Sequence, residues 1–225
     1  MAEKQIFTSR EINQALAKQL EVTRTVQLTG LKGQHCIAVG MATGSVVQVA
    51  GNAGDFFGAL NSGGSLTLNG NAGRFCGDSM LAGEIVVNGD AGWGVGQYMR
   101  GGTIAVKGEC KGPVGQLMKA GTILIDGPAG REVGKYLMGG EIVIAGETGE
   151  HTGENMMGGV IFLRGEPRSL GLNARTAKVA AGDIERLKFL HEQYRFRGIT
   201  EEEMFSEFQK VTPEHSRPLT GEAGR

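Results

Sequence analysis

The chain has 225 residues, of which 40% are hydrophobic and 21% charged, and its formal net charge at pH 7 is −1. Such a balance gives no reason to expect nucleic acid or an anionic membrane as a partner. No segment resembles a signal peptide or a membrane span, and the three cysteines, Cys36, Cys76 and Cys110, lack CxxC spacing. We therefore expect a reduced, cytoplasmic protein without a disulfide framework.

Residues 8–20 predict the first helix. Thr8 or Ser9 can serve as its N-cap. The apolar residues that follow share one helical face: Ile12, Ala15, Leu16 and Leu20. This face would cover the open end of the structure that follows.

From Gly51 onward, glycine recurs with a regular 19-residue period. The first column is Gly51, Gly70, Gly89, Gly108, Gly127 and Gly146. Glycines at the seventh and thirteenth places of each unit keep the same period, and a column at the third place fails only at Lys111. A residue at the same corner of every unit must adopt a positive φ or let the next backbone approach closely. The pattern therefore indicates a stack of coils.

Apolar and polar residues alternate in the second half of every unit. The apolar pairs are Leu66/Leu68, Ile85/Val87, Ile104/Val106, Ile123/Ile125, Ile142/Ile144 and Ile161/Leu163. This alternation predicts one strand per coil with one face buried, and a column running from Met80 to Met156 predicts further interior positions. A 19-residue coil is too short for a strand–helix crossover. We therefore predict an all-β repeat, a right-handed parallel β-helix of about seven coils, the first of them irregular.

The residues after Gly171 predict a helical tail. Asp183 can cap a helix that runs to Gly198, and Thr200 forms a capping box with Glu203 for a second helix that ends at Pro213. Such a tail would cover the last strand, whose free edge would otherwise favour aggregation. The chain thus divides into an N-terminal helix and lead-in (1–29), a β-helix (30–170) and a C-terminal helical tail (171–225).

One outward-facing column becomes more apolar toward the C-terminus. At the sixteenth place of successive coils stand Thr67, Val86, Ala105, Leu124, Val143 and Phe162. Leaving large apolar side chains in water costs about 1.5–3 kcal/mol each, so we expect a cover. The chain's own tail is the first candidate, and a partner subunit is the alternative.

The search for an active site identifies only weak candidates. His35 and Cys36 are adjacent, so on a strand they would point to opposite faces. Stacking places three charged pairs in phase, namely Asp90 with Glu109, Arg131 with Glu150, and Glu132 with His151. Exposed pairs of this kind are more often solvated charges or surface contacts than catalytic groups.

Two further patterns also fail as sites. His191 and His215 share no metal-ligand spacing. The glycine-rich segment 92–96 has a strand on both sides, whereas a dinucleotide-binding loop needs a helix after it. We therefore predict no catalytic, cofactor-binding or metal-binding residue in this chain.

The repeated G-x-x-G-x-x-x-G carries a family resemblance. It stands as GNAGDFFG (51–58), GNAGRFCG (70–77), GDAGWGVG (89–96), GPAGREVG (127–134) and GETGEHTG (146–153). Over about residues 30–165 the chain closely resembles the GXGXG domain, which forms the C-terminal β-helix of the glutamate synthase large subunit and also occurs in one subunit of formylmethanofuran dehydrogenase. The flanks SREINQAL (9–16) and FQKVTP (208–213) look like those of the glutamate synthase domain.

The resemblance implies a non-catalytic scaffold in a glutamate-synthase-like complex. Its partners would be a class II glutamine amidotransferase subunit and a synthase-type subunit that carries FMN and an iron–sulfur cluster, with no cofactor in this chain. The family's β-helix contributes no catalytic residue, so none is carried over. A formylmethanofuran dehydrogenase or formyltransferase/hydrolase complex is the alternative. A stand-alone β-helix hydrolase or carbohydrate binder is disfavoured, because one Trp and three Tyr are few for a sugar-stacking platform.

Overall fold

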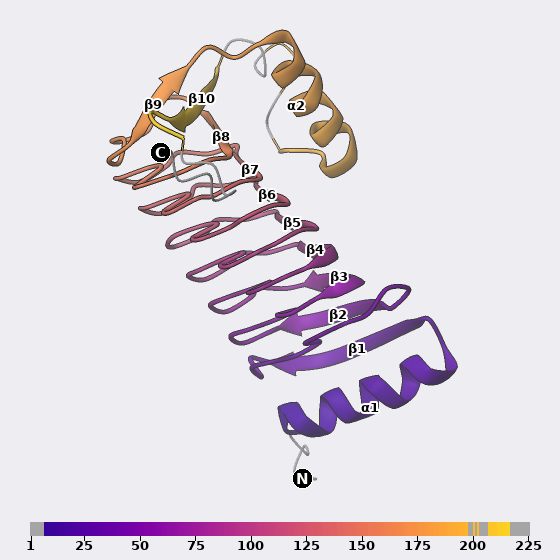
Figure 1. Cartoon of the computed structure of the whole chain (residues 1–225). Coiled ribbons are helices and arrows are strands. Elements are labelled where there is room, and N and C mark those ends of the chain that lie inside the picture. The colour runs from indigo at the N-terminus through magenta and orange to yellow at the C-terminus, as the bar shows by residue number, and fades with distance from the viewer. Residues whose placement is uncertain (1–6, 198–199, 201, 203–206, 217–225) are drawn as a thin grey trace, which may run out of the picture.

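The computed structural model describes residues 7–197, 200, 202 and 207–216, and over them the chain forms an elongated parallel β-solenoid (Figure 1). Its elements in chain order are α1 (Ser9–Val22), β1 (Thr25–Lys32), β2 (Val46–Asn52), β3 (Ser62–Asn69), β4 (Ala82–Val87), β5 (Thr103–Val106), β6 (Thr122–Ile125), β7 (Glu141–Ile144), β8 (Val160–Arg164), β9 (Ala174–Ala177), α2 (Ala181–Tyr194) and β10 (Phe208–Pro213). Among these residues no helix has the length and hydropathy needed to cross a membrane. The predicted all-β repeat of about seven coils is confirmed.

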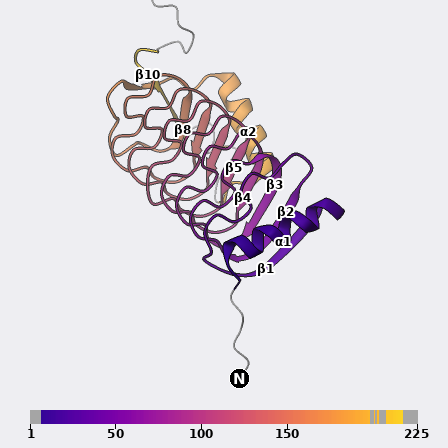
Figure 2. The same ribbon diagram turned by 60° about the horizontal axis from the view of Figure 1, so that its bottom comes forward.

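Strands β1 to β8 stack in parallel along one side of the solenoid, as Figure 2 shows from the N-terminal end. From β2 onward the stacking keeps the 19-residue period, as in the pairing of Leu66 with Ile85. Between β1 and β2 the offset is longer, since Gln27 pairs with Gln48, and a bulge separates Thr29 from Leu31. Because the first coil is longer, the glycines before Gly51 have spacings close to, but different from, those of the later coils.

The predicted interior columns form the core. Both apolar residues of each strand pair, from Leu66 to Leu163, are buried, as are Met80 and Met156 at the ends of the second column. Asn61 takes the methionine position in the first regular coil and is fully buried. Its amide donates to the Gly64 carbonyl at 2.8 Å and its oxygen accepts from the Gly64 N–H at 2.9 Å. Because both polar groups are satisfied, the coil tolerates this substitution.

Helix α1 covers the N-terminal end of the stack, as predicted. Thr8 is the N-cap, and its capping box with Glu11 is complete. Leu16 is buried in the solenoid core. The Asn13 side chain fixes the helix by donating to the Cys36 carbonyl at 2.6 Å and accepting from the Ala38 N–H at 3.0 Å.

The C-terminal tail contains one described helix, and its start differs from the prediction. Helix α2 begins at Ala181 with Ala180 as N-cap, so Asp183 lies in the first turn and is not the cap residue. Its carboxylate nevertheless reaches back to the Ala180 N–H at 2.8 Å. The helix ends at Tyr194, before the predicted Gly198, because Arg195 turns into the left-handed conformation.

The second predicted helix of the tail is wrong in its C-terminal half. Phe208–Pro213 forms strand β10, antiparallel to β8 on one side and to β9 on the other. The spacing of Phe208 and Val211 suits one helical face, but on a strand it places them on opposite faces. Val211 enters the solenoid core and Phe208 packs under α2. Glu203, of the predicted capping box, lies outside the described residues.

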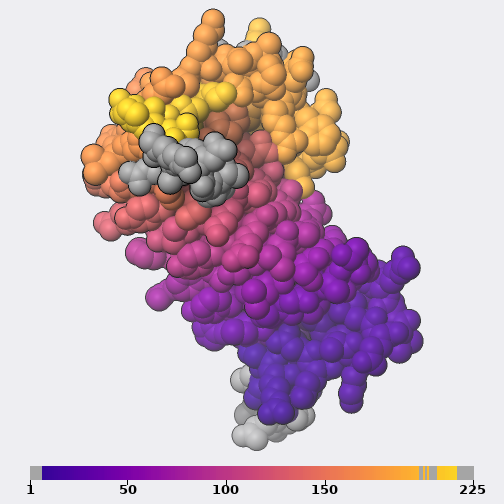
Figure 3. Space-filling model, in the orientation of Figure 1, coloured from indigo at the N-terminus to yellow at the C-terminus, as the bar shows by residue number. Residues whose placement is uncertain are grey.

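The apolar outward column is covered by the chain's own tail. Figures 1 and 3 show α2 lying along the side of the rod near its C-terminal end. The buried residues that form this second core are Ala105, Leu124, Val143, Ala145, Phe162, Leu187, Leu190, Phe196 and Phe208. This is the first of the two predicted arrangements, in which the tail and not a partner buries the stripe.

Polar contacts surround this second core. Arg186 forms an ion pair with Glu141, and Lys210 pairs with Asp183 at 2.8 Å. The Tyr194 hydroxyl donates to Glu84 at 2.7 Å, and burial, followed by that hydrogen bond, raises the pKa of Tyr194 to about 12. The hydroxyl therefore stays protonated and keeps donating at physiological pH.

Val143→Lys should lower the free energy of unfolding by about 3 kcal/mol, because the ammonium would be buried without a partner beneath α2. Val143 is fully buried. Guanidinium chloride unfolding of the isolated chain measures the change. Thr67→Lys is the control, since Thr67 stands in the same outward column but outside the α2-covered core. Equal stabilities of the two variants would contradict the assigned cover.

Close contact between backbones of successive coils explains the glycine columns. A Cβ at Gly83 would lie 2.4 Å from the Gly64 carbonyl oxygen, and its φ is +88°. Any side chain there would meet immovable backbone and strain its own. From Gly83 onward, the column at the thirteenth place of the coil therefore needs glycine on both grounds.

Gly83→Ala should lower the free energy of unfolding by at least about 2 kcal/mol, because left-handed strain and the clash with the Gly64 carbonyl act together. Gly182→Ala is the matched control. Gly182 lies in α2, and a Cβ there meets nothing within 4 Å. That variant should gain about 0.5–1 kcal/mol from helix propensity. Thermal unfolding of both variants distinguishes the effects, and a neutral Gly83→Ala would disprove the close-contact explanation.

Candidate functional site

The three in-phase charged pairs do not form catalytic dyads. The Glu132 carboxylate pairs with Lys135 at 2.8 Å, and His151 lies nearest Glu154 at 3.9 Å, so the predicted Glu132–His151 neighbours contact other partners. Asp90 accepts from the backbone N–H of Glu109 at 3.0 Å. Its carboxylate therefore joins successive coils and does not form an acid–acid pair with Glu109.

The predicted pair of Arg131 and Glu150 does not form a catalytic dyad either. Arg131 lies 3.9 Å from the Glu132 carboxylate, next to it in the chain, and Glu150 lies 3.9 Å from Arg168. Both contacts are long and both arginine side chains are mostly exposed, so each contributes little to stability. The predicted pairing of Arg131 with Glu150 is replaced by these neighbours.

The other candidate residues also have structural contacts. His35 Nδ1 accepts from the Asp55 N–H at 2.9 Å, while the Cys36 carbonyl holds α1. The His191 ring packs against Phe196 with centroids 5.7 Å apart. Backbone groups of His215 bond to the Asn173 side chain at 3.0 Å. Within the described ranges, no cluster of three or more His, Cys, Asp or Glu side chains could hold a metal ion.

The glycine-rich segment 92–96 does not resemble a phosphate-binding loop in three dimensions. Ala91 and Val95 each form parallel bridges to the next coil, at Cys110 and Val114. A turn follows at Gly96, and the chain continues around the coil without a helix. The segment is therefore followed by a strand and not by a helix, in agreement with the sequence prediction.

Two of the three thiols are chemically inert. Burial raises the pKa of Cys76 to about 12 and that of Cys110 well above its ordinary value, and neither side chain is accessible. Cys36 is exposed. All three cysteines are free, so none of them takes part in a disulfide.

Thiol titration should therefore modify Cys36 alone in the native chain at pH 8, and all three cysteines after unfolding. Reaction with a chromogenic disulfide followed by peptide mass spectrometry measures which residues react. Cys36→Ser should abolish the fast phase. Fast native-state labelling of Cys76 would contradict its placement in the core.

Exposed apolar side chains, among them Phe56, Leu60 and Tyr98, lie on the turns of the coils. We define the turn face as the residues at the fifth and ninth places of each coil. These are Phe56, Phe75, Gly94, Pro113, Glu132 and His151, and Leu60, Ser79, Tyr98, Leu117, Tyr136 and Asn155. Residues of both columns from two successive coils line one shallow cleft of about 480 Å³, so the columns lie side by side.

The N-terminal half of the turn face is apolar and exposed. The rings of Phe56 and Phe75 are stacked with centroids 5.0 Å apart. A Cβ at Gly94 would lie 2.6 Å from the Phe75 ring, and one at Gly112 would lie 2.5 Å from the Trp93 indole, so both aromatic side chains rest on a glycine of the next coil. Relative exposures are 37% for Phe56, 52% for Leu60 and 46% for Tyr98. Trp93, at the adjoining fourth place of its coil, is 49% exposed.

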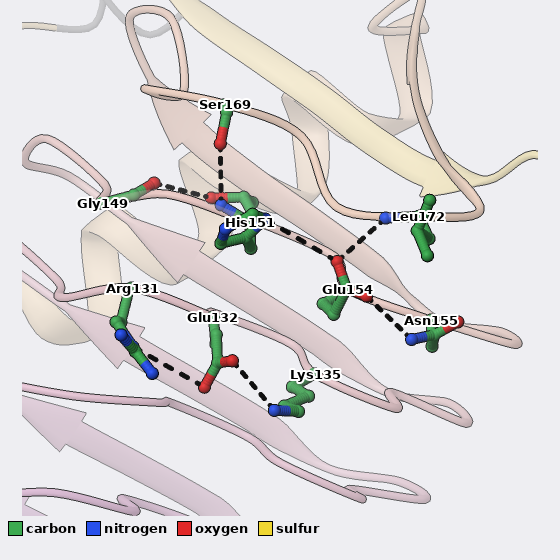
Figure 4. Close-up of polar contacts among 10 residues, drawn as sticks. Arg131, Glu132, Lys135, Gly149, His151, Glu154, Asn155, Ser169 and Leu172 are labelled. Carbon is green, nitrogen blue, oxygen red and sulfur yellow. Dashed lines mark hydrogen bonds and ion pairs between the residues drawn. The ribbon is translucent and has the colours of Figure 1, made fainter.

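The C-terminal half of the turn face is polar and internally paired (Figure 4). Glu154 accepts from the Leu172 N–H at 3.0 Å and from the Asn155 side chain at 2.8 Å. The His151 N–H donates to Ser169 Oγ at 2.9 Å. These bonds anchor the last coil to the segment that follows it, so this half is structural.

The backbone of the turn face is left-handed throughout, apart from Pro113. Values of φ include +62° at Phe56, +57° at Leu60 and +56° at Tyr98. Glycine or asparagine adopts this conformation readily, whereas other residues are strained by about 1–2 kcal/mol. The same columns accept Gly94, Ser79 and Asn155. Bulky apolar residues there are thus not required by the backbone.

Sequence reasoning missed this apolar half of the turn face. The signal was present in the repeat, because aromatic and leucine residues recur at the fifth and ninth places of the coils. The total numbers of Trp and Tyr in the chain do not show that these residues lie close together on one face. Two of the three tyrosines, Tyr98 and Tyr136, are exposed there.

The glycine-cornered parallel β-solenoid defines a repeat protein built from stacked coils. The profile of the GXGXG motif family matches residues 4–212, and the chain belongs to this family. A comparison with curated proteins gives no significant match. The family match extends beyond the repeat into α1 and β10, so both flanks belong to the unit that defines the family.

Proposed function

We propose that this chain is a non-catalytic scaffold subunit of a glutamate-synthase-like complex. In that role it holds a class II glutamine amidotransferase subunit and a synthase-type subunit, which carries FMN and an iron–sulfur cluster, in position for ammonia transfer to a 2-oxoacid. Membership of the GXGXG family over residues 4–212 is the observation that carries the proposal. The flanks included in that match are the segments that resemble the glutamate synthase domain.

The chemistry of the described side chains supports a scaffold role. A nucleophile needs a partnered base, but the buried thiols have raised pKa values and the candidate acids bond to backbone or to lysine. A rod whose interior core runs along its whole length can hold two partners at a fixed separation, because each coil packs on its neighbours.

The purified chain should show no glutaminase activity and no flavin absorbance, because catalysis and cofactor belong to its partners. Mixed with the purified amidotransferase and flavin-containing subunits of the same organism, it should form a stable assembly in sedimentation velocity. The mixture should then couple glutamine hydrolysis to 2-oxoacid amination. Turnover by the isolated chain, lost in His151→Ala or Cys36→Ser, would disprove the scaffold role.

The alternative is a formylmethanofuran dehydrogenase or formyltransferase/hydrolase type of complex, since the GXGXG domain also occurs there. Affinity purification of the chain from its own cells, followed by metal analysis, separates the two. Molybdenum or tungsten in stoichiometric amount would favour the alternative, whereas FMN and iron would favour the glutamate-synthase-like complex.

A further inference from the structure

We propose that the apolar half of the turn face, formed by Phe56, Leu60, Phe75 and Tyr98, together with Arg74 and Trp93 at the adjoining fourth place of their coils, is where a partner subunit docks. The matching surface would present apolar side chains and at least one carboxylate. This inference rests on the proposed function, because it assigns to one surface the partner binding that a scaffold requires.

The surface carries several exposed apolar side chains in three successive coils. Trp93 and Tyr98 are each about half exposed, at 49% and 46%, and Phe56 stacks on Phe75 in the two preceding coils. Contiguous exposed apolar patches on soluble proteins mark interaction sites. By contrast, α1 covers the apolar N-terminal end of the stack and α2 covers the outward sheet face. No described segment packs over the apolar half of the turn face.

The choice of residues argues against a purely structural origin. Phe56, Leu60 and Tyr98 combine an exposed apolar side chain with a left-handed backbone, two unfavourable features at one position. Ser79 and Asn155 occupy equivalent positions and fit that backbone with polar side chains. The coil geometry thus permits Asn or Ser, and docking accounts for the bulky residues.

A protein partner suits the composition of the patch. Trp, Tyr and Arg are the residue types most enriched at the energetic centres of protein interfaces. Arg74 is exposed, and within the described residues it forms no ion pair. A carboxylate on the partner would complement this cation.

Two other occupants fit less well. A second copy related by a twofold axis through the patch would bring the two Arg74 guanidinium groups together. A polysaccharide needs ring faces open for stacking, but Phe56 and Phe75 turn theirs toward each other at 5.0 Å. We therefore assign the patch to a partner subunit.

The chain contains a single tryptophan, so the patch carries its own probe. Incorporation of 5-fluorotryptophan gives one ¹⁹F resonance, from Trp93. Titration with the purified amidotransferase subunit, and separately with the purified flavin-containing subunit, should shift or broaden this resonance with one of the two. Sedimentation velocity of the same mixtures gives the dissociation constant.

The decisive variant is the double substitution Leu60→Asn/Tyr98→Asn. Asparagine favours the left-handed backbone, so the thermal midpoint of the free chain should stay unchanged or rise. Assembly should weaken at least about tenfold, because two central apolar contacts are lost. Arg74→Glu should weaken it as well, with a larger effect at low salt. Val22→Asn is the matched control, since Val22 is 90% exposed at the end of α1 and its replacement should leave binding normal.

The outcomes separate the two proposals. If the wild-type chain assembles and the double variant assembles equally well, the docking surface is wrong while the scaffold function stands. If the wild-type chain binds neither subunit, both are wrong. A resonance that shifts with the concentration of the chain alone would show self-association, and one that shifts with cellohexaose would show carbohydrate binding, and either result would overturn the assignment.

Discussion

Contact between the backbones of successive coils is the constraint on which the rest of the structure depends. A Cβ at Gly70 would lie 2.2 Å from the Gly51 carbonyl oxygen, and one at Gly130 would lie 2.4 Å from that of Lys111. Side chains cannot separate the coils at these corners, so glycine and the 19-residue length are fixed together. Where the coil becomes longer, between β1 and β2, a bulge absorbs the difference.

A stack of this kind exposes its two ends and the outer face of its sheet. The flanking segments cover these surfaces in different ways. Helix α1 closes the first end with Leu16, and β10 pairs with the edge of β8 at the other. Helix α2 builds a separate core on the outer side of the sheet. Polar contacts at the margin of that core, such as the ion pair of Lys210 with Asp183, connect the helix to β10.

The repeat, its strands and α1 could be predicted because their signals are local or periodic. Strand β10 could not, since the spacing of Phe208 and Val211 suits a helix equally well, and the choice is made by the unpaired edge of β8 far away in the sequence. The sequence also could not show that Glu132 and His151 bind other partners, because this depends on where the side chains of Lys135 and Glu154 lie. The turn face was detectable only by comparing the same position across coils.

The two halves of the turn face show how a repeat protein can separate structure from interaction. The backbone is the same in both halves, so their side chains are free to differ. Near the C-terminus these side chains bond to the segment after the last coil, as Glu154 does with Leu172. Farther from that end no described segment is within reach, and polar residues would gain nothing beyond solvation. Apolar residues at Leu60 and Tyr98 reduce the stability of the free chain through strain and exposure. Their contribution must therefore come from contacts outside the chain, and for that reason the apolar half, more than any polar cluster, is where binding partners should be sought.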